Sequence, residues 1–356
     1  MEKDSKIYIA GHSGLVGSAI VNNLISKGYK NLIFKTHDEL DLINQNEIDN
    51  FFKKEKPEYV ILAAAKVGGI VANNKFRADF IYENMMIQNN VIHHSYLHGV
   101  KKLLFLGSTC IYPKNTEQPI SEDYLLTSTL EYSNEPYAIA KIAGLKMCES
   151  YNLQYGTNFI AVMPTNLYGP NDNFDLEKSH VLPALLRKIH LGKCLKNKDW
   201  PAIRIDLNKN PIEDINGESS DKSILKILAK YGVKDNVICI WGSGMPKREF
   251  LWSEDMADAC IYLLENRDFE DTFSDSDKEV KNTHINIGTG VDISIKELAE
   301  EIKDSIGYKG NFIFDISKPD GTMQKLSNVT KLHGLGWKHS VTLKKGVEKM
   351  YAWYLS

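Results

Sequence analysis

The sequence predicts an α/β protein built on a Rossmann-type, doubly wound parallel sheet and followed by a smaller C-terminal α/β lobe. Short apolar runs alternate with helix-length stretches through the first half of the chain. A glycine-rich turn follows the first apolar run, and a Tyr-x-x-x-Lys pair lies in a later helix-length stretch. Strand-helix alternation of this kind is typical of a parallel sheet with helices on both faces.

Five apolar runs are predicted as strands of this sheet, because each is short and is separated from the next by a longer stretch. The stretches 71–98 and 137–155 are predicted helices. Ligands of such sheets bind beyond the carboxyl ends of the strands. The Gly11 turn, Ser108 and residues 164–169 all fall there. The predicted strands are 7–10, 31–35, 59–63, 102–106 and 159–163.

The second half of the chain is less regular. Residues 194–236 are rich in lysine, asparagine and aspartate. We expect a dinucleotide-binding domain over residues 1–170 and a second lobe over 171–356, with some crossover of segments between them. In this lobe the pattern predicts helices at 179–191, 294–305 and 343–354 and a strand at 237–241.

Composition excludes several classes of protein. The 356 residues carry a net charge of −3, so no basic field attracts nucleic acid or an anionic membrane. No apolar run is long enough to span a bilayer, and no signal peptide is visible. The five cysteines have no regular spacing, which fits a reducing cytoplasm better than a disulfide framework. No metal-ligand spacing is present.

The first candidate site is the turn formed by Gly11, Gly14 and Gly17. Glycine allows a tight turn and close approach to a pyrophosphate, while the following helix directs its amide dipoles at that charge. A plain strand-to-helix turn is the simpler interpretation of such a motif alone. Its place after the first strand favours a dinucleotide site that includes Ser13, Leu15 and Val16.

The end of the second strand bears on the choice between NAD and NADP. An acidic residue there binds the ribose 2′-hydroxyl, whereas a basic residue accommodates a 2′-phosphate. Here the strand ends with Lys35 and then His37, without an acid. This favours NADP(H) and leaves NAD(H) open. Asp41 and Leu42 fall where adenine contacts commonly lie.

The second candidate site consists of Tyr137, Lys141 and Ser108. Residues at i and i+4 share one helix face, so Tyr137 and Lys141 can point together into the crevice. A nearby ammonium is expected to lower the pKa of a tyrosine, which makes the phenol a suitable acid for an alkoxide. A surface pair is the alternative. Ser108, at the preceding strand end, favours a site that moves a hydride between a nicotinamide and a carbonyl.

Seven stretches carry a closer resemblance: 63–74, 107–113, 134–141, 163–169, 179–181, 241–251 and 317–321. With them the chain resembles the extended short-chain dehydrogenase/reductase family and, within it, the GDP-L-fucose synthase group. The resemblance implies an NADPH-dependent 3,5-epimerase and 4-reductase of GDP-4-keto-6-deoxy-D-mannose. It also implies a nucleotide-sugar-binding second lobe and a homodimer formed through the helices 71–98 and 137–155.

By this resemblance Cys110 and His180 are the epimerisation pair. A ketone at C4 makes the C3 and C5 hydrogens acidic, so a base must remove a proton and an acid must return one. Cys110 as thiolate suits the first role and His180 the second. Taken alone, Cys110 would be a small buried apolar residue and His180 a solvated one.

The resemblance assigns further contacts. Arginine suits the diphosphate because its guanidinium binds phosphate in a bidentate way. Cofactor contacts are assigned to Ala63, Ala64, Ala65, Pro164, Asn166, Leu167 and His180, and substrate contacts to Ser108, Thr109, Cys110, Asn166, Val181, Arg187, Trp241, Arg248 and Lys318.

Two departures from the family pattern keep alternatives open. Ser13 and His37 stand where familiar members have basic residues, so strict NADPH selectivity is not implied. An insertion within 194–234 lies where the family binds its nucleotide sugar. A C4-reductase of a GDP-4-keto-heptose in surface-polysaccharide biosynthesis, with or without epimerase activity, is therefore the main alternative. A non-catalytic dinucleotide-sensing protein is a remote one.

Overall fold

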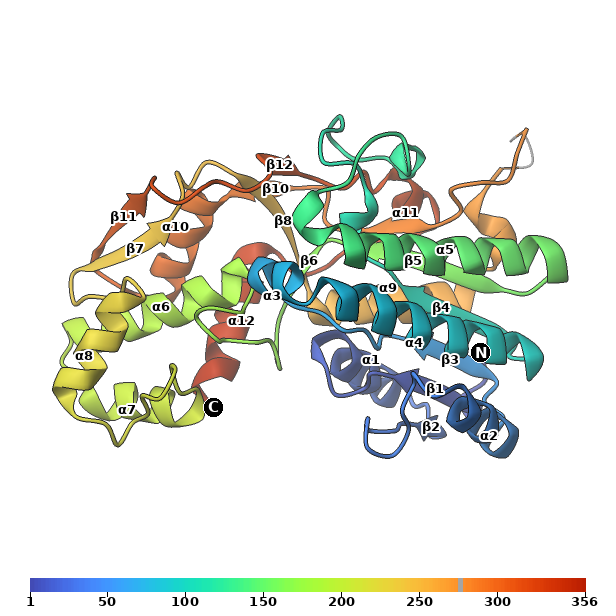
Figure 1. The fold of residues 1–356 in the computed structure, drawn as a ribbon, viewed down its shortest axis with the longest axis horizontal. Helices are drawn as coiled ribbons and strands as arrows, with labels where there is room; N and C mark the ends of the chain where they lie inside the picture. Colours follow the sequence, from blue (N-terminus) through green and yellow to red (C-terminus); the bar gives the residue numbers. More distant parts are fainter. Residues whose placement is uncertain (275–277) are drawn as a thin grey trace. The chain divides into compact units, whose positions relative to one another are not determined.

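The computed structural model describes residues 1–274 and 278–356, which form two compact units (Figure 1). The first unit consists of Met1–Asn171, Glu249–Val291 and Leu326–Val341. The second unit consists of Asp172–Arg248, Asp292–Lys325 and Thr342–Ser356. Two later segments of the chain thus return to the first unit.

The first unit is built on a parallel sheet of six strands, which confirms the predicted doubly wound architecture. The prediction missed the last strand, β9, and made β2 too long. Three of the predicted strands have the expected bounds, namely β1 and β4 of this sheet and β7 (Val237–Trp241) of the second unit. In spatial order the sheet contains β2 (Leu32–Ile33), β1 (Ile7–Ala10), β3 (Tyr59–Leu62), β4 (Lys102–Leu106), β5 (Phe159–Pro164) and β9 (Ile285–Ile287).

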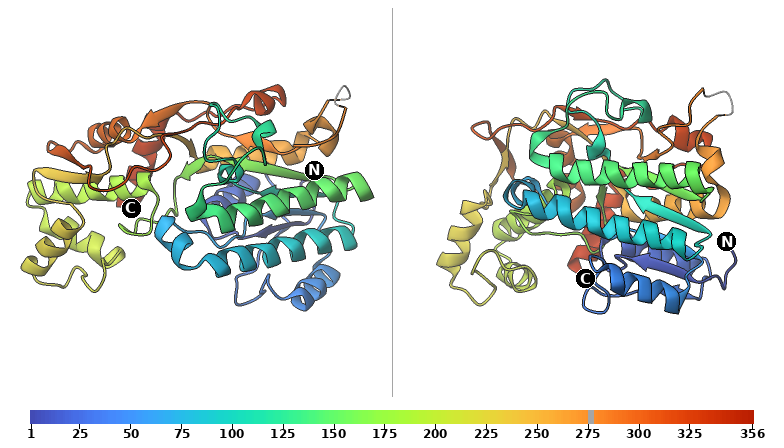
Figure 2. Two further views of the ribbon diagram at one scale, coloured as in Figure 1. Left: turned by 45° about the horizontal axis from the view of Figure 1, so that its top comes forward. Right: turned by 45° about the vertical axis from the view of Figure 1, so that its right-hand side comes forward.

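Helices cover both faces of this sheet because its strands are apolar on both sides. In β1, Ile7 and Ile9 pack with α1 and α9, whereas Tyr8 and Ala10 pack with α2, α4 and α5. Figures 1 and 2 show α4 and α5 side by side on one face. The helices of this unit are α1 (Leu15–Ser26), α2 (Gln45–Glu55), α3 (Ile70–Lys75), α4 (Arg77–Leu97), α5 (Glu135–Tyr155), α9 (Ser253–Asn266) and α11 (Thr330–Gly334).

The predicted single helix 71–98 is wrong in one respect, because the structure divides it at Phe76. This residue has φ −115° and ψ 41°, so α3 ends before it and α4 begins after it. The side chain of Asn73 donates hydrogen bonds to the carbonyls of Gly68 and Gly69. Such local bonds compete with regular helix, which explains a short and separate α3.

The carboxyl edge of the sheet positions the candidate site. The strands that follow β1 in the chain lie on opposite sides of it, β2 on one side and β3 on the other. This reversal creates a topological switch point between β1 and β3. Gly11 follows β1, Ala63 follows β3 and Ser108 follows β4 by two residues. Because the strands are parallel, these segments share one edge.

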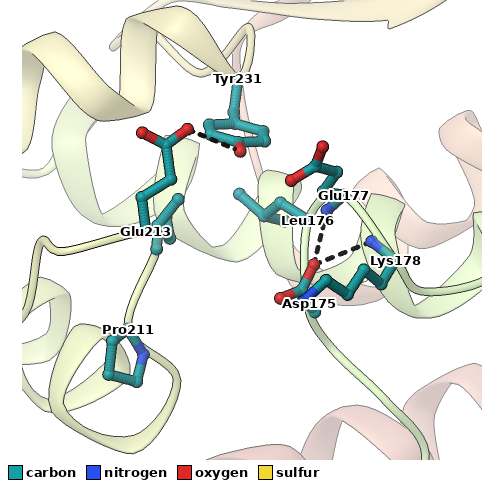
Figure 3. Close-up of a pocket in the computed structure, with 8 residues that line it drawn as sticks. Asp175, Leu176, Glu177, Lys178, Pro211, Glu213 and Tyr231 are labelled. Atoms are coloured by element: carbon teal, nitrogen blue, oxygen red, sulfur yellow. Dashed lines mark hydrogen bonds between the residues drawn. The ribbon is translucent and has the colours of Figure 1, made fainter. Parts of the chain in front are cut away.

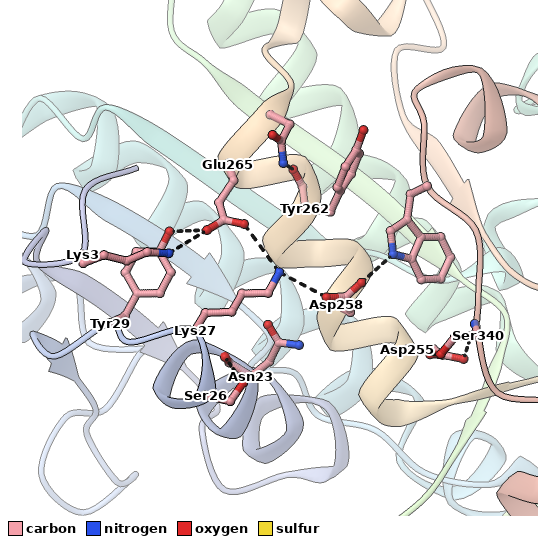
Figure 4. Close-up of polar contacts among 12 residues, drawn as sticks. Lys3, Asn23, Ser26, Lys27, Tyr29, Asp255, Asp258, Tyr262, Glu265 and Ser340 are labelled. Atoms are coloured by element: carbon pink, nitrogen blue, oxygen red, sulfur yellow. Dashed lines mark hydrogen bonds and ion pairs between the residues drawn. The ribbon is translucent and has the colours of Figure 1, made fainter.

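A polar network fixes α1 against α9 inside the first unit (Figure 4). Glu265 accepts hydrogen bonds from Tyr29 Oη at 2.5 Å and Lys3 Nζ at 3.2 Å. Lys27 forms ion pairs with Asp258 at 3.1 Å and with Glu265 at 3.5 Å. The C-terminal end of α1 is thereby anchored, so its N-terminal end has a defined place at the sheet edge.

The second unit combines short strands with five helices among its described residues. Strand β7 pairs in parallel with β11, and β10 and β12 flank β8, which runs on into the first unit and pairs there with β6 (Asn166–Tyr168). The strands are β7 (Val237–Trp241), β8 (Lys247–Trp252), β10 (Asp292–Ser294), β11 (Asn311–Asp315) and β12 (Gln324–Lys325). The helices are α6 (Val181–Lys196), α7 (Trp200–Lys209), α8 (Asp221–Lys230), α10 (Ile295–Ile306) and α12 (Leu343–Leu355).

The segment 194–234 is folded rather than irregular. It contains α7 and α8, whose apolar faces pack against α6 in a cluster of their own. Ile203, Leu207, Ile224 and Leu228 are fully buried in this cluster. The segment is therefore an ordered part of the second unit.

A buried carboxylate organises the returning segments of the first unit. Glu249 is fully buried, and it accepts hydrogen bonds from the amides of Thr289 at 2.6 Å, Gly290 at 2.7 Å and Ser327 at 2.9 Å. Its backbone carbonyl accepts a bond from Asn166 Nδ2 at 2.9 Å. The Glu249 side chain thus joins its own strand to the segments that contain Thr289 and Ser327, near the end of β5.

We predict that Glu249→Gln lowers the free energy of unfolding by about 2–4 kcal/mol. The NH₂ group of the glutamine would face backbone N–H donors, so donors would meet there without an acceptor. Chemical denaturation measures the change. Glu300→Gln is the control, since Glu300 is exposed and forms a surface ion pair with Lys303. Equal stability of both variants would contradict the organising role of Glu249.

Candidate active site

The glycine turn after β1 leaves no room for side chains. Gly11 has φ +85°, and a Cβ on it would lie 2.6 Å from the backbone nitrogen of Ala64. A Cβ on Gly17 would lie 2.0 Å from the carbonyl oxygen of Gly11. Glycine at both positions is thus required for the close approach of α1, β1 and the segment after β3.

The N-terminus of α1 is open at this turn. Its N-cap residue is Gly14, and no side chain caps the helix. The amides of Leu15, Val16 and Gly17 therefore lack the side-chain acceptor that commonly satisfies a first turn. An anionic group such as a diphosphate would fit there, because the helix dipole adds to the amide donors. Ser13 lies within the same turn, between the first two glycines.

The loop after β2 carries the residues that we predict to meet the ribose end of a dinucleotide. Lys35 Nζ lies 3.6 Å from Glu39, and the exposed ring of His37 lies 4.0 Å from Asp41. Glu39 accepts bonds from Thr36, which lower the pKa of its carboxyl group. Glu39 therefore closes a local turn, while Lys35 and His37 supply the positive character. Leu42 is half-buried beside them.

Ser108 and Cys110 are brought together by a short turn after β4. Ser108 has an extended backbone and precedes the 3₁₀ turn Thr109–Ile111. Its Oγ accepts a hydrogen bond from the amide of Cys110 at 3.3 Å. Thr109 is buried, whereas Ser108 and Cys110 are half-buried. The turn therefore holds the Ser108 hydroxyl against the backbone of Cys110 at the sheet edge.

Tyr137 and Lys141 lie one turn apart on α5, above the same strand end. Lys141 is buried, and its Nζ donates a hydrogen bond to the carbonyl of Leu106 at 2.8 Å. The same Nζ lies 5.8 Å from the centre of the Tyr137 ring. Cys110 acts electrostatically on both groups. The structure thus gathers Ser108, Cys110, Tyr137 and Lys141 at the end of β4.

Burial controls the protonation of this group. It lowers the pKa of Lys141 from 10.5 to about 8, an effect that Cys110 partly opposes. It raises the pKa of Tyr137, and Cys110 adds to that rise. The expected lowering of the Tyr137 pKa by Lys141 is therefore wrong for this structure, because Lys141 Nζ bonds to the Leu106 carbonyl and not to the phenol. Tyr137 stays protonated at neutral pH, as a proton donor must.

The remaining predicted contacts of the first unit border the same edge. The amide of Ala63 donates to the carbonyl of Ala10 at 3.0 Å, which continues the β3 register into the site. Ala64 and Ala65 follow it and are half-buried. At the end of β5, Pro164 is buried, and Asn166 and Leu167 open β6 with half-buried side chains.

His180 and Val181 stand at the start of α6 in the second unit. His180 is the N-cap residue and its side chain makes no capping bond. Its ring is exposed, while the surrounding protein still lowers its pKa by partial desolvation. Histidine is thus mainly neutral here at neutral pH, with one ring N–H available to donate.

An exposed aromatic ring with two lysines forms a second cluster, which we define as Trp241, Lys188 and Lys318. The Trp241 side chain is 64% exposed at the end of β7. Lys188 Nζ and Lys318 Nζ lie 6.0 and 5.5 Å from its ring centre. Arg248 donates to the carbonyls of Lys247 at 2.7 Å and Thr322 at 2.6 Å. An aromatic face flanked by cations suits a base that carries phosphates.

The prediction of a substrate contact for Arg187 is wrong. Its side chain is fully buried, and Nε and Nη2 donate to Asp206 at 3.0 and 2.8 Å. Nη1 donates to the carbonyl of Phe174 at 3.1 Å, and Nη2 also bonds to the carbonyl of Asn210. The guanidinium is therefore committed to the interior of the second unit and does not reach a ligand surface.

Sequence analysis missed Lys188, the next residue along α6. Burial lowers the pKa of its ammonium, which lies over Trp241. The spacing of His180, Ala184 and Lys188 was the available signal, because residues four apart share one helix face. The resemblance was instead taken to place the substrate contact at Arg187.

The part of the chain that the structure describes contains no group of three or more His, Cys, Asp or Glu side chains able to hold a metal ion. Among the same residues, no helix is long and apolar enough to cross a bilayer.

Comparisons with known proteins agree with the fold. The model of the NAD dependent epimerase/dehydratase family matches residues 7–205 and 212–288. The chain is 50% identical over 355 residues to putative GDP-L-fucose synthase 2 of Arabidopsis thaliana, with 100% of this chain and 93% of the relative covered.

Two solved structures from Campylobacter jejuni are similar over 100% of both chains. CJ1428, a GDP-D-glycero-L-gluco-heptose synthase in the presence of NADPH, is 49% identical with a TM-score of 0.92. MlghC, a GDP-mannoheptose C4 reductase with NADP bound, is 48% identical with a TM-score of 0.89.

We predict that Gly17→Ala weakens dinucleotide binding at least about tenfold, or ~1.4 kcal/mol, because its Cβ would displace the Gly11 carbonyl. Titration of cofactor fluorescence measures the dissociation constant. Gly334→Ala is the matched control, since no atom lies within 4 Å of the added Cβ. Unchanged binding by Gly17→Ala would contradict the tight turn.

Proposed function

Because the chain belongs to the NAD-dependent epimerase/dehydratase family, we propose that it is an NADPH-dependent oxidoreductase with 3,5-epimerase activity. It converts GDP-4-keto-6-deoxy-D-mannose to GDP-L-fucose. The observation that carries this proposal is the gathering of Ser108, Cys110, Tyr137 and Lys141 at one strand end. Ser108, Tyr137 and Lys141 would carry hydride transfer, and the Cys110 thiol at the same strand end would be the base for epimerisation.

The glycine turn fits the cofactor. No side chain caps the N-terminus of α1, so a diphosphate can approach the amides of its first turn. Lys141 would hold the nicotinamide ribose, and Lys35 and His37 would meet a 2′-phosphate. When bound, NADPH supplies a hydride to C4 of the sugar. Two similar structures, described with NADPH or NADP, support this choice.

Three residues would carry the reduction. Ser108 Oγ donates a hydrogen bond to the C4 carbonyl oxygen and orients it. Tyr137 gives its phenolic proton to that oxygen as the hydride arrives, and solvent later restores the proton. Lys141, charged below pH of about 8, would orient the nicotinamide by holding its ribose, and this hold would weaken when the ammonium loses its charge.

Cys110 and His180 would carry the epimerisation. Cys110 as thiolate would remove the acidic proton from C3 or C5, and the protonated imidazole of His180 would return a proton on the opposite face. Proton exchange with solvent would then restore the thiolate and the imidazolium before the next epimerisation. Cys110 belongs to the first unit and His180 to the second. The electrostatic effect of the Cys110 thiol on Tyr137 and Lys141 supports the first assignment, since it shows that the thiol lies near the groups proposed for the reduction.

The second cluster would bind the GDP moiety. The exposed face of Trp241 offers a stacking surface for guanine, and Lys188, Lys318 and Arg248 supply positive charge for the diphosphate. Val181, at the start of α6, would border the sugar.

A second candidate is C4 reduction of a GDP-4-keto-heptose in surface-polysaccharide biosynthesis, with or without epimerisation. It is favoured by the two similar structures that carry heptose names. The folded α7–α8 segment is the part of this chain that could distinguish the two sugars.

We also propose a cytoplasmic homodimer. Tyr82 and Leu97 of α4 and Ile139 and Leu153 of α5 are 41–59% exposed, which is more apolar surface than a solvated helix pair needs. A second copy of α4 and α5 would cover it.

Incubation with GDP-4-keto-6-deoxy-D-mannose and NADPH in heavy water tests the main proposal. NMR of the product should show GDP-L-fucose with deuterium at C3 and C5. Reduction without deuterium would leave a plain reductase. Rapid turnover of a GDP-4-keto-heptose in place of this sugar would favour the second candidate.

We predict that Tyr137→Phe lowers kcat for reduction by about 10²–10⁴-fold, because the proton donor is lost. Deuterium exchange at C3 and C5, which depends on Cys110 and His180, should persist. NADPH oxidation and NMR measure the two activities separately. Unchanged NADPH oxidation would refute the assignment of Tyr137.

We predict that reduction slows as pH rises through about 8, since Lys141 is charged below its lowered pKa and neutral above it. Lys141→Arg keeps its charge at all these pH values. Relative to its own rate at neutral pH, this variant should therefore retain activity at pH of about 9, where the wild type declines. The same alkaline decline in both proteins would exclude Lys141 as its source.

A further inference from the structure

The loop that ends at His180 is held in place at Phe174. The Phe174 ring is buried, stacks on Trp353 with centres 6.1 Å apart, and lies 4.6 Å from the Tyr354 ring. Its carbonyl accepts the hydrogen bond from Arg187 Nη1 at 3.1 Å. Side chain and backbone of this one residue thus anchor the loop before α6.

Arg187 and Asp206 form the centre of that anchor. Both side chains are 1% exposed. Asp206 Oδ1 accepts both guanidinium bonds, while Oδ2 accepts the Tyr354 hydroxyl. Asp206 lies in α7, and Arg187 also bonds to the carbonyl of Asn210 just after that helix. The ion pair therefore joins α6, the loop, α12 and the 194–234 segment.

A cavity lies where the loop and the 194–234 segment face each other (Figure 3). Its volume is about 210 Å³. The bonds drawn there run within each side: Asp175 accepts from the amides of Glu177 and Lys178, and Glu213 accepts from Tyr231 at 3.0 Å. Arg187 therefore supplies the polar link between the loop before α6 and the 194–234 segment.

We propose that the Arg187–Asp206 ion pair positions His180 and so gives the 194–234 segment a role in epimerisation. Arg187 stands seven residues after His180 on the same helix, about two turns away. By holding the loop at Phe174 and the body of α6 at Asp206, the pair determines where the histidine stands. Buried ion pairs contribute little net stability compared with apolar replacements, so a positioning role accounts for this one better than stability does. The inference rests on the proposed epimerase activity of His180.

The test variant is Arg187→Met combined with Asp206→Leu. Removal of one partner would leave a buried charge, whereas the double change keeps an apolar interior and removes the donor to Phe174. Leu228→Ala in α8 is the matched control. It creates a cavity in the same cluster, against which Leu176 of the loop packs, but it leaves the polar contacts of Arg187 with Asp206 and Phe174 intact.

Two activities are compared in each protein. Deuterium incorporation into GDP-4-keto-6-deoxy-D-mannose without NADPH measures epimerisation. Oxidation of GDP-L-fucose by NADP⁺ measures hydride transfer at C4, which needs no epimerisation. We expect the ratio of the first rate to the second to fall at least about tenfold in the double variant, as expected for a displaced catalytic group. The ratio should be unchanged in Leu228→Ala.

Amide hydrogen exchange of residues 172–180 is the readout that does not depend on the reaction. It should accelerate in the double variant and not in Leu228→Ala. Equal exchange in the wild type and the double variant, or proportional loss of both activities in both variants, would overturn the proposal. If the wild type incorporates no deuterium, the proposed epimerase function fails, and amide exchange alone decides whether the ion pair holds the loop.

Discussion

The close approach of three backbone segments at the carboxyl edge of the sheet is the constraint on which the first unit depends. Gly11, Gly17 and Ala64 lie so near one another that any Cβ on either glycine would overlap backbone atoms. This approach allows α1 to begin directly at the switch point with its amides uncovered. The Glu265 and Asp258 contacts hold the far end of the helix, so the open end has a defined place.

Burial then determines what the neighbouring groups can do. Lys141 is removed from water at the end of β4, which brings its pKa to about 8 and makes its charge sensitive to mild alkali. The same environment keeps Tyr137 protonated. The phenol therefore keeps its proton until the carbonyl oxygen takes up negative charge during reduction, and that developing charge must draw the proton from it. The thiol of Cys110 lies within the same electrostatic environment.

Much of this arrangement could be predicted from the sequence because it depends on local pattern. Continuous apolar runs identified β1, β4 and β7, and the glycine spacing identified the turn before α1. The break at Phe76 was missed, since it depends on Asn73 bonding back to local carbonyls. Arg187 was misassigned because its partner, Asp206, belongs to the inserted segment, and the pairing of the two side chains depends on how that segment packs against α6. The Tyr137 pKa was misjudged because the acceptor for Lys141, the Leu106 carbonyl, becomes visible only in three dimensions.

Transfer of deuterium from NADPH labelled at C4 of the nicotinamide tests the central claim most directly. We propose that Ser108, Tyr137 and Lys141 form a site at which C4 of a GDP-bound keto sugar accepts a hydride. We expect NMR of the product to show one deuterium at C4 of the sugar and a single configuration at that carbon. Oxidation of the labelled NADPH without deuterium at sugar C4, or no reaction with either GDP-4-keto sugar, would contradict it.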